Sequence, residues 1–167
     1  MTTARQVQKL GLALAATAMI VVLPFAPAQV PEARAATTEM IVVDWHTGLA
    51  IGGYDPVAYF TDGKPLAGSA DFELRYGGAV WRFRNMGNRE AFAARPDVYM
   101  PQFGGYDPLG ISHGTAVAGN PFVWRINDER LFLFYDRSRA DAFDADPARA
   151  IAAAEREWPQ VRRTLSP

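Results

Sequence analysis

The chain reads DFELRYGGAVWRFR between residues 71 and 84, and this pattern predicts a β-hairpin. Gly77 and Gly78 suit the positive φ angles of a two-residue primed turn. Counting outward from that turn gives one apolar and one charged face, with these opposed pairs: Tyr76–Ala79, Leu74–Trp81 and Phe72–Phe83 on the first face, Glu73–Arg82 and Asp71–Arg84 on the second. A slip of one residue would expose the aromatic face, so we expect the register to be fixed.

A short helix is predicted directly after this hairpin. Asn85 is a suitable N-cap, and Phe92 falls on the side that we expect to face the core. The helix should end at Arg95, because Pro96 forces the residue before it out of helical backbone angles.

Residues 122–135 predict a second hairpin, which turns between Asn127 and Arg130. Its return strand, residues 131–135, has almost no polar face, and such a run is typical of a strand buried on both sides. The alternative is that this strand forms an exposed surface for a partner.

The C-terminal region predicts a helix. Asp146 is placed to cap it, Pro147 takes the first helical position, and alanine-rich sequence continues to Trp158. Ile151, Ala154 and Trp158 fall on one stripe, so we expect the helix to dock on the sheet.

These elements predict one small α+β domain in which two antiparallel hairpins form a sheet, packed by short helices including the C-terminal one. Residues 104–119 are glycine-rich, and we expect strand structure there only around Ile111 and Val117. The length of the chain fits a single core. With no cysteine in the chain, disulfides are excluded and burial must stabilise the fold, for which its 10 Phe, 6 Tyr and 4 Trp residues are suited.

Residues 1–35 have the features of an export signal peptide. A basic start precedes an apolar run at residues 10–23, and a proline-containing tail leads to Ala33-Arg34-Ala35, an A-x-A cleavage pattern. We expect cleavage between Ala35 and Ala36, which gives a periplasmic or secreted protein. The apolar run is shorter than the roughly 20 residues of a bilayer span, so no membrane span is expected after cleavage. The alternative is an uncleaved signal that anchors the protein to the membrane.

The charge of the mature chain argues against one class of partner. Removal of residues 1–35 takes away Arg5, Lys9, Arg34 and Glu32, which leaves 14 basic and 17 acidic residues with mixed signs along the chain. Binding of nucleic acid needs a concentrated basic face, so we expect no nucleic-acid partner.

The sequence GGYDP occurs twice, at residues 52–56 and 104–108. Aspartate before proline often caps a turn with its side chain, which predicts a structural role for Asp55 and Asp107. The alternative brings both carboxylates to one pocket, as metal ligands or as the acid/base pair of a small hydrolase or isomerase. An acid/base pair would need to lie within about 10 Å.

The two histidines, His46 and His113, each lie near one copy of GGYDP. An oxygen-rich site with histidine would suit zinc or copper(II) better than copper(I), which prefers sulfur. Nucleophilic catalysis has little support, because the chain has no cysteine and no G-x-S-x-G pattern. No Gly-rich phosphate-binding pattern is present either, so we expect no nucleotide cofactor.

Residues 53–60, GYDPVAYF, resemble the opening of exported YHS domain proteins. The likeness continues through these residues: Gly68-Ser69, Phe72, Gly78, Trp81-Arg82-Phe83, Asn88-Arg89-Glu90-Ala91-Phe92, Pro96, Tyr99-Met100-Pro101, Gly104-Gly105-Tyr106, Leu131-Phe132-Leu133 and Trp158-Pro159. The resemblance implies a YHS-like domain over residues 50–160, preceded by an N-terminal segment at 36–49 and followed by a tail at 161–167.

The resemblance also implies metal handling, but the thiols that serve it in the family are missing. The short relatives associated with heavy-metal transport have cysteines at the positions held here by Ala58, Arg84 and Asn88. Longer exported relatives commonly have cysteine where this chain has Asp107. A thiolate metal site is therefore excluded by composition.

We therefore expect an exported binding or accessory domain without catalytic activity of its own, with copper or zinc as the ligand that the resemblance implies. The metal ligands would be His113 and Asp107, followed by His46 and Asp55. The alternative is a scaffold in the periplasm that binds a protein partner without metal.

Overall fold

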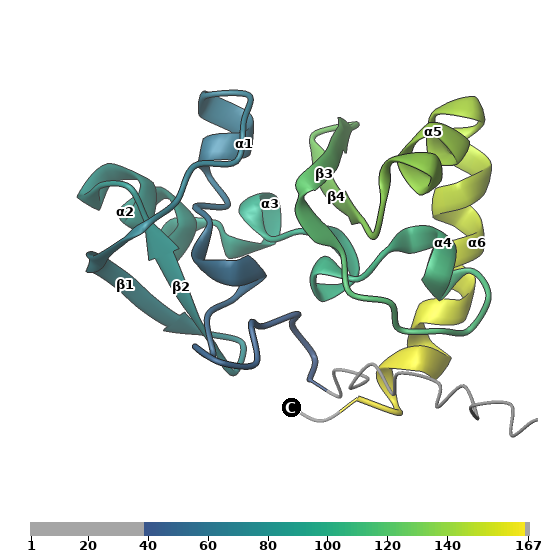
Figure 1. Ribbon diagram of the computed structural model, residues 1–167, viewed down its shortest axis with the longest axis horizontal. Coiled ribbons are helices and arrows are strands. Elements are labelled where there is room, and N and C mark those ends of the chain that lie inside the picture. The colour runs from purple at the N-terminus through teal and green to yellow at the C-terminus, as the bar shows by residue number, and fades with distance from the viewer. Residues whose placement is uncertain (1–38, 166–167) are drawn as a thin grey trace, which may run out of the picture. The chain divides into compact units, whose positions relative to one another are not determined.

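A computed structural model describes residues 39–165 of the chain as an α+β domain, which confirms the predicted class (Figure 1). The predicted signal peptide lies outside the described residues. In chain order the elements are η1 (Ile51–Gly53), α1 (Ala58–Thr61), β1 (Ser69–Tyr76), β2 (Ala79–Phe83), α2 (Met86–Ala94), α3 (Pro96–Tyr99), η2 (Gln102–Gly105), α4 (Pro108–Ile111), β3 (Asn120–Asn127), β4 (Arg130–Phe134), α5 (Arg137–Ala145) and α6 (Pro147–Arg162). Each hairpin, β1–β2 and β3–β4, forms its own two-stranded sheet. No helix within residues 39–165 has the length and apolar character needed to cross a bilayer.

The first hairpin has the predicted register near its turn and a different one further out. The pairs Tyr76–Ala79, Leu74–Trp81 and Glu73–Arg82 are confirmed. The pairs Phe72–Phe83 and Asp71–Arg84 are wrong, because β1 is irregular between Ser69 and Glu73 and Ser69 lies opposite Phe83. The irregularity shifts the outer part of β1 relative to β2, as a β-bulge does.

Helix boundaries follow the predicted caps. The Asn85 side chain accepts a hydrogen bond from the Asn88 amide at 2.8 Å, and α2 ends at Arg95 as expected. Asp146 caps α6 by accepting from the Arg149 amide at 3.0 Å, and this helix continues beyond Trp158 to Arg162.

The expectation of strand structure around Ile111 and Val117 is wrong. Ile111 is the last residue of helix α4, and Val117 lies outside the strands. The helix forms because Asp107 caps it and Pro108 supplies a first helical residue with preset φ.

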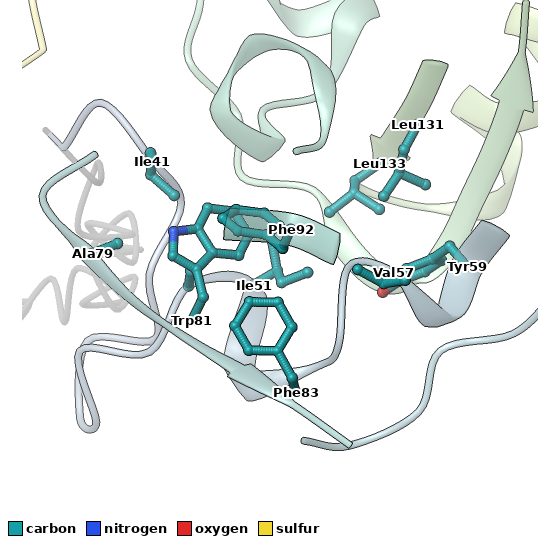
Figure 2. Close-up of a cluster of buried hydrophobic side chains, with 11 residues drawn as sticks. Ile41, Ile51, Val57, Tyr59, Ala79, Trp81, Phe83, Phe92, Leu131 and Leu133 are labelled. Carbon is teal, nitrogen blue, oxygen red and sulfur yellow. The ribbon is translucent and has the colours of Figure 1, made fainter. Parts of the chain in front are cut away.

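Strand β4 is buried on both faces, as predicted, so the alternative of an exposed partner surface at this strand is wrong. All side chains from Leu131 to Phe134 have 0% exposure. Leu131 and Leu133 belong to a first core cluster that includes Trp81, Phe83 and Phe92 (Figure 2). Phe132 and Phe134 belong to a second core cluster with Tyr106, Phe143 and Ile151.

The described residues contain the same unit twice. Elements α1, β1, β2 and α2 recur as α4, β3, β4 and α5 with identical lengths of 4, 8, 5 and 9 residues. The irregularity in β1 between Ser69 and Glu73 also recurs in β3, between Asn120 and Trp124. Residues 51–94 and 102–145 are called the first and second copy below.

Candidate functional site

Asp55 connects the beginning of the first copy to its hairpin. Its side chain is fully buried, and Oδ1 accepts from the Val57 amide at 2.9 Å. Oδ2 accepts from the backbone amide of Arg84, just beyond β2, at 2.9 Å and from Nδ2 of Asn88 at 2.6 Å. One carboxylate thus joins the GGYDP corner to β2 and α2.

Asp107 makes the corresponding bonds in the second copy. It is also fully buried, and Oδ1 accepts from the amides of Leu109 at 2.8 Å and Gly110 at 3.3 Å. Oδ2 accepts from the Tyr135 amide, just beyond β4, at 2.9 Å, and Arg139 Nη1 lies 3.6 Å from it.

These two arrangements, called the carboxylate latches below, have corresponding partners. The amides that bind Oδ2 belong to Arg84 and Tyr135, and the α2 and α5 side chains that approach it belong to Asn88 and Arg139; both pairs are 51 residues apart. A carboxylate that accepts several hydrogen bonds in a buried place stabilises the backbone groups around it. The structural role predicted for a turn-capping aspartate therefore accounts for every oxygen of both side chains.

Two of the three positions at which the resemblance implied thiols, Arg84 and Asn88, take part in the first latch. The Arg84 amide and the Asn88 side chain both bind Asp55 Oδ2, while Ala58 is fully buried in α1. Asp107, for which the resemblance implied a cysteine position, forms the second latch.

The two histidines are exposed, whereas the carboxylates of the latches are buried. His113 Nδ1 lies 2.6 Å from the Leu109 carbonyl oxygen, so the ring donates there, and the residue lines a groove of about 390 Å³ together with Asp146 and Arg149. His46 is exposed and its ring stacks on Trp45 with centroids 3.2 Å apart. Within residues 39–165, no group of three His, Asp or Glu side chains is placed to hold a metal ion.

Tyr59 joins the two copies through a buried hydroxyl. The phenol donates to the Pro121 carbonyl at 3.0 Å, and its ring packs edge-on against Trp124 with centroids 5.4 Å apart. Burial raises the pKa of Tyr59 well above its ordinary value of 10.0, and the nearby Tyr54 and Asp55 raise it further.

Replacing Tyr59 with phenylalanine is expected to make stability less sensitive to alkaline pH. Because the folded-state pKa is raised, the contribution of the neutral phenol is complete below pH 10 and is lost above it, by up to about 1.4 kcal/mol per pH unit. Tyr59→Phe should cost about 1 kcal/mol at neutral pH through the lost hydrogen bond, and its disadvantage should shrink above pH 10. Urea unfolding at neutral pH and near pH 11 measures this, with the half-exposed Tyr76→Phe as control. An equal alkaline loss in Tyr59→Phe and the unmodified chain would contradict it.

Sequence reasoning identified the two aspartates and missed their partners. Arg84 and Tyr135 contribute backbone amides, for which a side-chain pattern gives no signal. The available signal was the 51-residue spacing of the predicted N-cap Asn85 and of Asp136, which caps α5 by accepting from the Arg139 amide at 3.0 Å. That spacing extends the GGYDP repeat into a complete second copy.

Comparison of the chain with family models, curated proteins and solved structures finds no match.

Proposed function

We propose that this protein is an exported interaction module that binds a protein partner without metal and without catalysis of its own. One observation carries the proposal: Asp55 and Asp107, the carboxylates most suited to chemistry, are fully buried and bonded to backbone amides of their own copies. A carboxylate held in this way stabilises a framework and has no exposed oxygen to offer a substrate.

The donor set favours this function over the metal-related one. The thiols of the resembling family are absent, and the oxygens of Asp55 and Asp107 are already bonded. His113 shares its groove with the carboxylate of Asp146 and the guanidinium of Arg149. The guanidinium repels a cation and offsets the attraction of the carboxylate.

The site of action that we propose is the periplasm or the outside of the cell. This part of the proposal depends on the signal-like composition of residues 1–35, which lie outside the described part of the chain.

The proposal predicts that stability and partner binding are both independent of metal. A site with micromolar affinity would raise the free energy of unfolding by about 2.7 kcal/mol when the free ion is at a hundred times the dissociation constant. Thermal unfolding with Cu(II) or Zn(II) is therefore a sensitive test. We expect no shift with either ion and none with chelator. A partner captured from periplasmic extract, then purified, should bind the purified chain equally with and without chelator.

Two results would contradict this function. A metal-dependent rise in unfolding temperature that is lost in His113→Ala and retained in His46→Ala would restore the metal site. Recovery of no partner that binds again in purified form would leave the interaction module without support.

A further inference from the structure

The outer edge of β3 has backbone groups that no strand pairs within residues 39–165. β3 pairs with β4 alone, and Asn127 lies opposite Arg130 across a two-residue turn with positive φ at Asp128 and Glu129. Such a turn makes its flanking residues a hydrogen-bonded pair, so alternation directs the backbone groups of Ile126 away from β4.

Those outward groups are partly unsatisfied. The Trp124 carbonyl, which points the same way, accepts from Arg125 Nη1 at 2.9 Å. In the part of the chain that the structure describes, neither the amide nor the carbonyl of Ile126 has a hydrogen-bond partner. An unpaired strand edge is a template for another strand.

A groove of about 390 Å³ runs along this edge. Its lining consists of residues 122–126 of β3 together with Arg137 and Asp141 of α5. In Figure 1, α5 lies beside the β3–β4 hairpin, and the Arg125 side chain joins the two through Asp144 at 2.7 Å. A groove between a strand edge and a helix is a geometry in which proteins bind extended peptides by strand addition.

The side chains of the groove differ from those at the same places in the first copy. Phe122 is 62% exposed and Ile126 is 37% exposed, whereas the corresponding positions 71 and 75 hold Asp71 and Arg75. Phe122 is positioned by an edge-on contact with Tyr54, with ring centroids 4.9 Å apart. The second copy therefore presents apolar side chains where the first presents charges.

A side chain crosses the corresponding edge of the first copy. There, Arg89 of α2 donates through Nε to the outward carbonyl of Glu73 at 2.8 Å. The corresponding residue of α5 is Ala140, which is buried and too short to reach the strand. The equivalent carbonyl of the second copy, that of Trp124, is bonded by Arg125 of β3 itself, so no side chain of α5 crosses this edge, and the groove of the second copy differs mainly in its apolar side chains.

The charged side chains of the groove indicate which charge its ligand should have. Arg125 is neutralised by Asp144 at 2.7 Å and by Asp141 at 3.6 Å. Arg137 is exposed, and within residues 39–165 it has no ion pair or hydrogen bond from its side chain. An occupant with a carboxylate would complement this guanidinium.

We propose that the groove between β3 and α5 binds an extended peptide segment of a partner protein as an added strand. The segment places apolar side chains at alternate positions on Phe122 and Ile126 and an acidic side chain at Arg137. This inference rests on the proposed interaction function and specifies its surface and its partner chemistry.

The probe is an immobilised array of nonapeptides with randomised sequence, to which the purified chain is applied. Selected peptides should alternate apolar and polar residues and contain Asp or Glu. Their affinity should fall about tenfold or more in Arg137→Glu and in Ile126→Asp, and should be retained in Arg137→Lys. The matched control is Arg75→Glu at the corresponding edge of the first copy, which should bind normally. Thermal unfolding of each variant confirms that it is folded.

Backbone methylation separates strand addition from other modes of binding. Strand pairing uses every second amide of the peptide, so N-methylation of one alternate set should abolish binding and methylation of the other set should be tolerated. Equal tolerance of both sets, selection of no peptide, or affinity unchanged in Arg137→Glu and Ile126→Asp would each overturn the proposal. A natural partner that binds these variants normally and is not displaced by the selected peptide would overturn the groove while leaving the interaction function in place.

Discussion

Replacing Asp107 with alanine is expected to lower the free energy of unfolding by about 3–5 kcal/mol. The substitution leaves the amides of Leu109 and Tyr135 without their acceptor beside a fully buried position, and each unsatisfied buried group costs about 1–3 kcal/mol. It also leaves Arg139 without its carboxylate partner. Asp55→Ala should have a similar effect, because Val57, Arg84 and Asn88 lose an acceptor in the same way.

Urea unfolding followed by tryptophan fluorescence measures this loss. The control is Asp97→Ala, which removes a carboxylate outside both latches and should change stability by no more than about 0.5 kcal/mol. Asp107→Asn retains one acceptor oxygen, so its free energy of unfolding should lie between those of Asp107→Ala and the unmodified chain. Unchanged stability in Asp107→Ala would show that the latch does not hold the corner, and would return this carboxylate to the candidates for ligand chemistry.

The second large effect is expected for Gly119→Ala and its counterpart in the first copy, Gly68→Ala. A Cβ at Gly119 would lie 2.5 Å from Leu133 Cβ and 2.7 Å from the Gly105 carbonyl oxygen, and one at Gly68 would lie 2.5 Å from the Arg82 carbonyl carbon. Backbone atoms give way little, so each substitution should cost about 3 kcal/mol by separating the corner from its hairpin.

A third glycine separates crowding from backbone strain. Gly63 has φ +63, and the Cβ that alanine would add there has no neighbour within 4 Å, so Gly63→Ala tests the cost of φ alone, about 1 kcal/mol. Gly68 and Gly119 do not have positive φ. Thermal unfolding of the three variants should therefore place the unfolding temperature of Gly63→Ala well above those of the other two, and equal stabilities would contradict the crowding.

Local features of the fold could be predicted from the sequence because their causes are local. The glycine turn at Gly77-Gly78, the cap at Asn85 and the cap at Asp146 each depend on residues within four positions, and all three are confirmed. The irregularity in β1 could not be predicted in this way, because it accompanies a contact between Gly68 and the backbone of Arg82, fourteen residues further along the chain.

The candidate site also combines local contacts, which could be predicted from the sequence, with long-range contacts, which could not. Turn capping by Asp55 and Asp107 follows from their own neighbours, and their Oδ1 bonds agree with it. Their Oδ2 atoms bond to backbone amides 29 and 28 residues further along the chain. Every residue type except proline has such an amide, so the sequence does not indicate which one is the partner. The ligand roles considered for His46 and His113 came from nearness in sequence to GGYDP, which says nothing about where an exposed imidazole lies in space.

Strand β4 has a consequence for how the chain reaches its native state. Since Leu131 and Leu133 complete the core of the first copy, a chain that ends at residue 101 would leave Trp81 and Phe92 in an unfinished interior. We therefore expect that the N-terminal half does not fold stably before the C-terminal half has been synthesised. Although the molecule is built from a repeated unit, we expect both copies to fold and unfold together in one cooperative transition. The chain would then stay unfolded until nearly all of it has been synthesised.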